Sequence, residues 1–382
     1  MGRCGRHLGT HHEPMTRTAA DHAPAPVGVA VSVAAIFPGQ GSQKVGMGRE
    51  LYEASPAAKA VLDAAEASLP GLLSIMWDGP EATLQLTENQ QPALVAAGAA
   101  AYAAYLERGG RPASIGAGHS LGEYTAHVAA GSLTIGEAVR LVNARGRYMQ
   151  EAVPDGAGAM AAILKVETDV IEDVIAEVMG SFASTGAEEL VAIANLNAPG
   201  QTVISGTAGG VAVAVERLKG AGARAVPLKV SAPFHCRLMA PAAERLAEDL
   251  AAVEFKTPDF AIVCNVTARP LGSPSEAASL LERQVTSSVR WVECMRYMQF
   301  AGASVTDASR AAQEGSNAAL DGSRATRHES NATRHESRGV RFIEFGSGEV
   351  LTNLARRIVQ DADAMAIHDA ASLEEVSDDT RA

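Results

Sequence analysis

Apolar runs of strand length alternate along this chain with segments rich in alanine and leucine. The first run, Val31 to Phe37, predicts a buried strand, and Pro38-Gly39-Gln40-Gly41 predicts the turn that ends it. A second apolar run at 114–118 again leads into helical segments. Repeated strand–turn–helix order indicates an α/β fold with a parallel sheet, because parallel strands need crossover connections. The elements expected here are strands at 31–37 and 114–118 and helices at 49–68, 93–108, 123–130 and 135–153.

Residues 159–229 form a block with a different order. Strand, helix, strand, strand, helix and strand follow one another, which is the order of a ferredoxin-like split βαβ unit. We therefore expect a small subdomain inserted into a larger α/β domain made of 29–158 and 230–360. Within the block we expect strands at 160–166, 190–195, 202–205 and 224–229 and helices at 169–179 and 211–220. In the large domain after it we expect strands at 260–266 and 340–345 and helices at 274–283, 291–300 and 350–359.

Three segments lack this apolar patterning. Residues 1–28 are polar, histidine-rich and broken by prolines, which predicts a disordered tail and leaves Met15 as an alternative start. Residues 303–338 hold a seven-residue tandem repeat, Ala325–Ser330 and Ala332–Ser337, without the apolar positions of a coiled coil. We expect a flexible insertion there. Residues 361–382 are expected to form an acidic C-terminal tail.

Composition narrows the class of protein. The chain has 382 residues, 47% of them hydrophobic, so it can bury a sizeable core. Its net charge of −12 argues against nucleic acid or an anionic membrane as a partner. The four cysteines are widely spaced, which predicts neither a metal site nor a disulfide framework. Because no apolar run is long enough for a membrane span and no signal peptide is recognisable, we expect a cytoplasmic protein.

The motif Gly118-His-Ser-Leu-Gly122 lies between a predicted strand and a predicted helix. Its small residues allow a sharp turn that presents the Ser120 hydroxyl at a helix N-terminus. The positive end of that helix favours a developing oxyanion. The sequence makes Ser120 a candidate nucleophile, and a purely structural turn remains the alternative.

A serine nucleophile needs a base, and four histidines lie outside the tail and the insertion. His119 adjoins Ser120, but the turn should direct it elsewhere, and His127 suits core packing in the following helix. His235 follows a strand and a proline, where a loop residue is rigidly presented. His368 is the fourth. His235 is therefore the preferred base on spacing alone.

Seven short motifs follow one another along the chain: Phe37-Pro-Gly-Gln-Gly-Ser-Gln43, Gln91-Pro-Ala93, Gly118-His-Ser-Leu-Gly-Glu123, Val142-Asn-Ala-Arg-Gly146, Gly158-Ala-Met160, Asn197-Ala-Pro-Gly-Gln-Thr-Val-Ile-Ser-Gly206 and Ala232-Pro-Phe-His-Cys-Arg-Leu-Met239. In composition and order they resemble the malonyl-CoA:acyl carrier protein transacylases of fatty-acid synthesis. That family has a hydrolase-like α/β domain with an inserted ferredoxin-like subdomain, which agrees with the block at 159–229.

The resemblance implies a role for each of these residues. Ser120 would be the nucleophile and His235 its base, with the imidazole oriented by the backbone carbonyl of Gln284 in place of an aspartate. The N–H groups of Leu121 and Gln40 would form the oxyanion hole. The remaining expectations concern substrate binding: Arg145 pairs with the malonyl carboxylate, Gln91 lines the pocket, and the Phe234 ring disfavours an α-methyl branch.

The implied reaction is a ping-pong transfer of malonyl from malonyl-CoA to the phosphopantetheine thiol of an acyl carrier protein. Malonyl-CoA is then a substrate, no cofactor is expected, and the enzyme is expected to act as a monomer. The insertion at 303–338 and Gly346-Ser347-Gly348, in place of a more usual Gly-Pro-Gly, depart from the family pattern.

Three other functions remain open at this point. An esterase or thioesterase could use the same serine motif, although its histidine usually lies near the C-terminus. A catalytically idle scaffold module is the second alternative. The third is an acyltransferase of polyketide synthesis, which differs only in its carrier.

Overall fold

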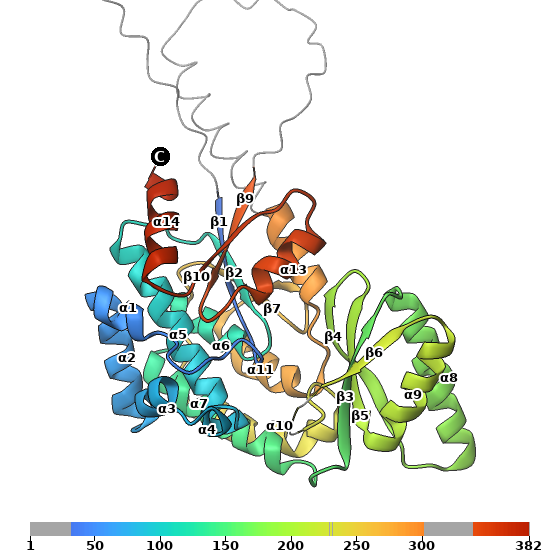
Figure 1. The fold of residues 1–382 in the computed structure, drawn as a ribbon. Helices are drawn as coiled ribbons and strands as arrows, with labels where there is room; N and C mark the ends of the chain where they lie inside the picture. The colour runs from blue at the N-terminus through green and yellow to red at the C-terminus, as the bar shows by residue number, and fades with distance from the viewer. Residues whose placement is uncertain (1–31, 229, 231, 302–338, 382) are drawn as a thin grey trace, which may run out of the picture.

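The computed structural model describes residues 32–228, 230, 232–301 and 339–381, and these form two sheets with helices around them (Figure 1). The larger sheet has the order β10-β9-β1-β2-β7-β8, and every neighbouring pair is parallel except β7 and β8. The predicted parallel α/β architecture is confirmed. Its strands are β1 (Ser32–Phe37), β2 (Ile115–Gly118), β7 (Ala261–Cys264), β8 (Arg269–Pro270), β9 (Val340–Phe345) and β10 (Asp363–Ile367).

Both faces of this sheet are covered, which explains the uninterrupted apolar run of β1. Val33, Ala35 and Phe37 pack into one core with α2, α5 and α7, whereas Ala34 and Ile36 pack into another with α13 and the helix at 291–301. The helices of the large domain are α1 (Arg49–Ala54), α2 (Pro56–Ser68), α3 (Leu72–Asp78), α4 (Glu81–Leu84), α5 (Thr87–Glu107), α6 (Gly122–Ala129), α7 (Ile135–Glu151), α10 (Ala240–Ala251), α11 (Ala277–Thr286), α13 (Val350–Ile358) and α14 (Ala370–Arg381).

The second sheet is antiparallel and has the order β4-β5-β3-β6. With α8 and α9 against it, this is the ferredoxin-like arrangement that the sequence predicts, and it stands to one side of the larger sheet (Figure 1). Its elements are β3 (Gly158–Leu164), α8 (Thr168–Thr185), β4 (Val191–Ala198), β5 (Gln201–Thr207), α9 (Ala208–Gly220) and β6 (Arg224–Pro227).

Two predicted elements have different bounds. The helix expected at 49–68 is two helices, because Ser55 is extended and its side chain caps α2, whose first residue is Pro56. The helix expected at 93–108 begins earlier, at Thr87, and contains Pro92 within its first two turns.

The tail predicted at 361–382 is wrong. Asp363–Ile367 forms β10, which pairs in parallel with β9, and α14 follows it. This strand has only five residues, one of them the charged Asp363 and two of them alanine, so its apolar pattern alone is weak. Its pairing with β9 stabilises it. The tail predicted at 1–28 and the insertion predicted at 303–338 lie outside the described residues. Within the described part of the chain, every helix is too short or too polar to cross a membrane.

Candidate active site

Ser120 occupies a tight turn at the carboxyl end of β2. Its φ of +54° is left-handed, an unusual conformation for a residue with a side chain. The flanking glycines make this turn possible: a Cβ on Gly118 would lie 1.8 Å from the carbonyl carbon of Gly122, and one on Gly122 would lie 2.2 Å from the Phe37 oxygen. The G-x-S-x-G spacing therefore reflects backbone crowding around a nearly buried serine.

His235 lies against the Ser120 hydroxyl. The distance from Ser120 Oγ to His235 Nε2 is 2.8 Å, and His235 Nδ1 lies 2.9 Å from the backbone oxygen of Gln284. Because that carbonyl can only accept, the ring proton belongs on Nδ1 and leaves Nε2 free to accept the serine proton. Burial, aided by the charge of Arg145, lowers the pKa of His235 to about 3. The imidazole is thus neutral at physiological pH, as a general base must be.

Arg145 reaches the same hydroxyl from α7. Its Nη2 donates to Ser120 Oγ and to Gln284 Oε1, each at 3.1 Å, and its Nη1 donates to Gln91 Oε1 at 2.8 Å. The side chain is 1% exposed, its Nε has no partner, and no described carboxylate forms an ion pair with it. A buried guanidinium without a counter-ion beside a nucleophile suits an anionic ligand.

Gln40 and Leu121 belong to neighbouring turns at this edge of the sheet. The parallel register pairs Phe37 with Gly118, so the chain after β1 runs beside the turn after β2. The N–H of Ser120 itself donates to Asn265 Oδ1 at 2.8 Å, so it is already used. The N–H of Leu121, at the start of α6, and that of Gln40 remain the candidates for an oxyanion hole.

Two further predicted residues border this group. Gln91, buried in α5, contacts Arg145 as described and places its amide nitrogen 3.9 Å from the sulfur of Met149. Phe234 is buried next to His235 and joins the core of the large domain.

The other candidate histidines make contacts elsewhere. His119 Nε2 bonds Asn197 Oδ1 of β4 at 2.8 Å, which links the two sheets. His127 bonds Ser132, and His368 pairs with Asp369. Of the four histidines considered, His235 alone bonds Ser120.

Asn265, which the sequence analysis missed, holds the serine turn in place. Besides accepting from the Ser120 N–H, its side chain donates to the Gly118 oxygen at 2.7 Å. Asn265 follows β7, the parallel strand next to β2, so its carboxyl end meets the same edge of the sheet. A polar residue directly after a buried strand is the signal that could have found it.

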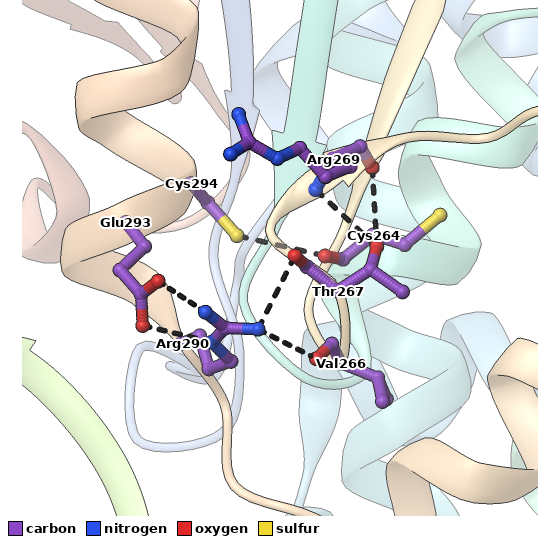
Figure 2. Close-up of polar contacts among 7 residues, drawn as sticks. All are labelled: Cys264, Val266, Thr267, Arg269, Arg290, Glu293 and Cys294. Atoms are coloured by element: carbon purple, nitrogen blue, oxygen red, sulfur yellow. Dashed lines mark hydrogen bonds and ion pairs between the residues drawn. The ribbon is translucent and has the colours of Figure 1, made fainter.

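Arg290 in turn holds the backbone that directly follows Asn265. Its Nη1 donates to the backbone oxygens of Val266 and Thr267, each at 3.3 Å (Figure 2). Its own backbone N–H donates to the Asn265 oxygen. Glu293 forms an ion pair with its guanidinium. The turn beside the nucleophile is thus fixed from the start of the helix at 291–301.

Within the described part of the chain, no three histidine, cysteine, aspartate or glutamate side chains gather as a metal ligand set. The arrangement offers a serine with an adjacent neutral base and an unpaired buried cation. Such a group can form an acyl-serine intermediate from a substrate that carries a negative charge.

Comparison with known proteins adds an independent line of evidence. A family model described as "Acyl transferase domain" matches residues 35–312. The malonyl CoA-acyl carrier protein transacylase of Bacillus subtilis is 40% identical over 90% of this chain and 95% of its own length. An acyl carrier protein S-malonyltransferase from Vibrio cholerae is 38% identical, with a TM-score of 0.76 over 90% of this chain and 99% of that one. A malonyl-transacylase solved in complex with its type II polyketide synthase acyl-carrier protein is 37% identical, with a TM-score of 0.76 over 91% and 99% of the chains.

Proposed function

This chain belongs to the malonyl CoA-acyl carrier protein transacylase family, and we therefore propose that it transfers malonyl from malonyl-CoA to the phosphopantetheine thiol of an acyl carrier protein. One observation carries the proposal beyond family membership. The Ser120 hydroxyl touches a neutral base, His235, and a buried arginine without a carboxylate partner, Arg145. These are the needs of a nucleophile that accepts an acyl group bearing a free carboxylate.

In the first half-reaction, Ser120 Oγ attacks the thioester carbonyl and His235 Nε2 takes the hydroxyl proton. The carbonyl oxygen becomes an oxyanion, which the N–H groups of Leu121 and Gln40 stabilise. The intermediate collapses as the C–S bond breaks, and His235 returns the proton to the departing coenzyme A thiolate. Malonyl remains esterified to Ser120.

The second half-reaction reverses these steps with a different thiol. The carrier thiol loses its proton to His235 and attacks the malonyl ester, and the Ser120 alkoxide recovers the proton as it leaves. Because one product departs before the second substrate enters, the kinetics are ping-pong. The proposed steps use the two substrates and groups from one chain, which supports action as a monomer without a cofactor.

Arg145 supplies selectivity for malonyl over neutral acyl groups. Its planar guanidinium can give two parallel hydrogen bonds to the malonyl carboxylate, and the low polarity around it strengthens them. Gln91 holds the opposite side of this guanidinium. We further propose that the Phe234 ring crowds an α-methyl branch, a discrimination worth about 1–3 kcal/mol.

Fatty-acid synthesis is the proposed setting, since the Bacillus subtilis transacylase described above shares nearly its full length with this chain. A thioesterase would use the same serine and base but would have no use for Arg145. Delivery to a polyketide carrier uses the same chemistry, and the solved complex with such a carrier keeps it as the second candidate.

Intact-mass spectrometry after mixing with malonyl-CoA tests the proposal. We expect a malonyl adduct on the wild type, none on Ser120→Ala, and a weak one on Arg145→Ala. Acetyl-CoA should give little adduct on the wild type. Adding a holo acyl carrier protein should then remove the adduct and leave malonyl-carrier.

Free malonate without malonyl-carrier would contradict the proposal and indicate a thioesterase. Absence of any adduct or turnover in the wild type would indicate a scaffold. Parallel assays with fatty-acid and polyketide carriers, compared by kcat/KM, decide the setting.

A further inference from the structure

Glu123 is a buried carboxylate that the proposed mechanism does not use. It lies in the first turn of α6, three residues after Ser120, and is 1% exposed. Its Oε2 accepts two hydrogen bonds, one from Gln284 Nε2 at 2.7 Å and one from the backbone N–H of Asn265 at 3.0 Å. Both donors belong to elements far from α6 in sequence, and both touch the serine turn.

Gln284 connects the base, the arginine and the serine turn. Its backbone oxygen accepts from His235 Nδ1, and its side-chain Oε1 accepts from Arg145 Nη2. Its side-chain Nε2 donates to the Ser120 backbone oxygen at 3.0 Å as well as to Glu123. One glutamine therefore contacts all three groups that the transfer reaction uses.

The Gln284 amide works in only one orientation. If its oxygen and nitrogen exchanged places, the oxygen would face the Glu123 carboxylate and the amide protons would face the Arg145 guanidinium. Both contacts would be repulsive in a buried environment. Glu123 at one end and Arg145 at the other thus select the observed orientation.

The same carboxylate also supports Asn265. By accepting from the Asn265 N–H, Glu123 holds the residue whose side chain bonds the Ser120 N–H and the Gly118 oxygen. Glu123 is therefore joined to the serine turn along two routes, through Gln284 and through Asn265.

We propose that Glu123 is a positioning residue of the transfer reaction: it holds Gln284 and Asn265 so that Arg145 and Ser120 keep their geometry, with the Gln284 amide separating it from Arg145. This inference rests on the function proposed above. The separation matters, because a direct Glu123–Arg145 ion pair would occupy the guanidinium that should bind the malonyl carboxylate. The amide keeps the carboxylate out of direct contact with the guanidinium, so the arginine stays free for substrate.

The role requires an acceptor oxygen at this position more than a full charge. Burial raises the pKa of Glu123 to about 7, even though its hydrogen bonds to Asn265 and Gln284 act in the opposite direction. Either protonation state presents an oxygen to both donors. Glutamine, which has the same length and one amide oxygen, should therefore substitute for it.

Glu344 offers a matched control. Like Glu123, it is a buried carboxylate that accepts two hydrogen bonds, but its donors are both backbone N–H groups, those of Leu351 and Thr352, at 3.1 and 2.7 Å. Burial raises its pKa to about 7 as well. The hydrogen bonds that it makes are to α13 and not to the serine turn.

The experiment measures kcat and KM for malonyl and acetyl transfer to a holo carrier protein, together with Tm. The variants are Glu123→Ala, Glu123→Gln and Glu344→Ala. We expect Glu123→Ala to lower kcat about 100-fold, the effect of a small misplacement of reacting groups. Its malonyl-to-acetyl ratio of kcat/KM should fall about tenfold, because the Gln284 amide that accepts from Arg145 is no longer held by Glu123. Glu123→Gln should stay within about threefold of the wild type in both quantities.

Glu344→Ala should lower Tm as Glu123→Ala does but keep the wild-type kcat and ratio. Wild-type kcat and ratio in Glu123→Ala would overturn the inference, as would an equal loss of kcat in Glu344→Ala. If Glu123→Ala does not fold, Glu123→Asp replaces it: this shorter side chain should lose about tenfold in kcat while Glu123→Gln does not. Equal kcat in Asp and Gln variants would also overturn it. Failure of the proposed function is separate, since the wild type would then form no malonyl-serine.

Discussion

Two strand–turn–helix units at the same edge of the large sheet hold their turns by different means. In β2–α6 the turn carries Ser120, and in β9–α13 it carries Ser347 between two glycines. Each unit contains a buried glutamate whose pKa burial raises to about 7. Glu344 bonds the N-terminal N–H groups of the helix in its own unit, whereas Glu123 bonds residues of other elements.

The contacts of the two turns explain why one is a reactive site and the other is only a structural turn. The Ser347 hydroxyl is buried and has no hydrogen-bond partner among the described residues. The Ser120 hydroxyl instead bonds His235, 115 residues away, and Arg145. A strand–turn–helix unit becomes a site only where long-range contacts converge on its turn.

The largest expected effect is that of removing each serine hydroxyl. Ser120→Ala should lower malonyl transfer about 10⁴-fold or more, because no covalent intermediate can form. Ser347→Ala removes the same atom from the other turn and should leave transfer within about twofold of the wild type. Both variants are measured by malonyl transfer to a holo carrier protein. Equal losses of activity would contradict the conclusion that only the Ser120 turn is a reactive site.

Asn265→Ala should have the next largest effect. It removes the side-chain bonds to the Ser120 N–H and the Gly118 oxygen, so the turn loses support that does not come from its own unit. We expect kcat to fall about 100-fold. Thr267→Ala, two residues further along the same turn, is the control, and its kcat should stay near that of the wild type. An unchanged kcat in Asn265→Ala would mean that the turn holds itself.

The low pKa of His235 gives a smaller effect, in pH dependence. A histidine with an ordinary pKa would be about 97% protonated at pH 5, and kcat/KM would fall about 30-fold from its value at pH 7.5. Since burial and Arg145 lower the pKa of His235 to about 3, the free enzyme should keep kcat/KM within about threefold over that range. Single-turnover malonylation from pH 5 to 7.5 measures this, and a 30-fold fall would contradict it.

Glu344 should produce the smallest effect, on stability alone. A raised pKa means that the folded state holds the proton more tightly, so this contribution to stability is full below the unfolded pKa of about 4.5 and is lost as the pH rises through about 7. Glu344→Gln should therefore reduce the stability lost between pH 5 and pH 8 by about 2 kcal/mol. Denaturant unfolding at the two pH values measures it. Exposed Glu50→Gln is the control, and an equal change there would contradict the prediction.

Elements with a strong apolar pattern could be predicted from the sequence. Three strands of the large sheet lie within a few residues of their expected positions: β1, β2 and β9. The elements of the small subdomain also follow in the expected order. In each case one or both faces of the strands are buried, which produces the apolar pattern. β10 could not be found in this way. It has only five residues and begins with the charged Asp363, and its stability comes from pairing with β9.

The candidate site divides in the same manner. Ser120 has a local signal, the glycines that its turn requires. His235 has a weaker one, a loop position after a proline, and family resemblance was needed to separate Arg145 from a solvated helix charge. Asn265 has only its place directly after a buried strand as a signal, and Glu123 has no local signal of its contacts with Gln284 and Asn265. These contacts form only in the folded chain, because the residues lie in different elements.

The sequence by itself determined the parallel architecture, the inserted subdomain and the nucleophile turn, because burial pattern and glycine crowding act over a few residues. Only the tertiary structure decided that His235 is neutral, that Arg145 lacks a carboxylate partner and that Gln284 contacts both. These properties depend on burial and on distances between elements far apart in the sequence: 139 residues separate Arg145 from Gln284, and 49 separate His235 from Gln284. The position of a residue in the sequence does not give its burial or its distance from other elements, because tertiary packing determines both.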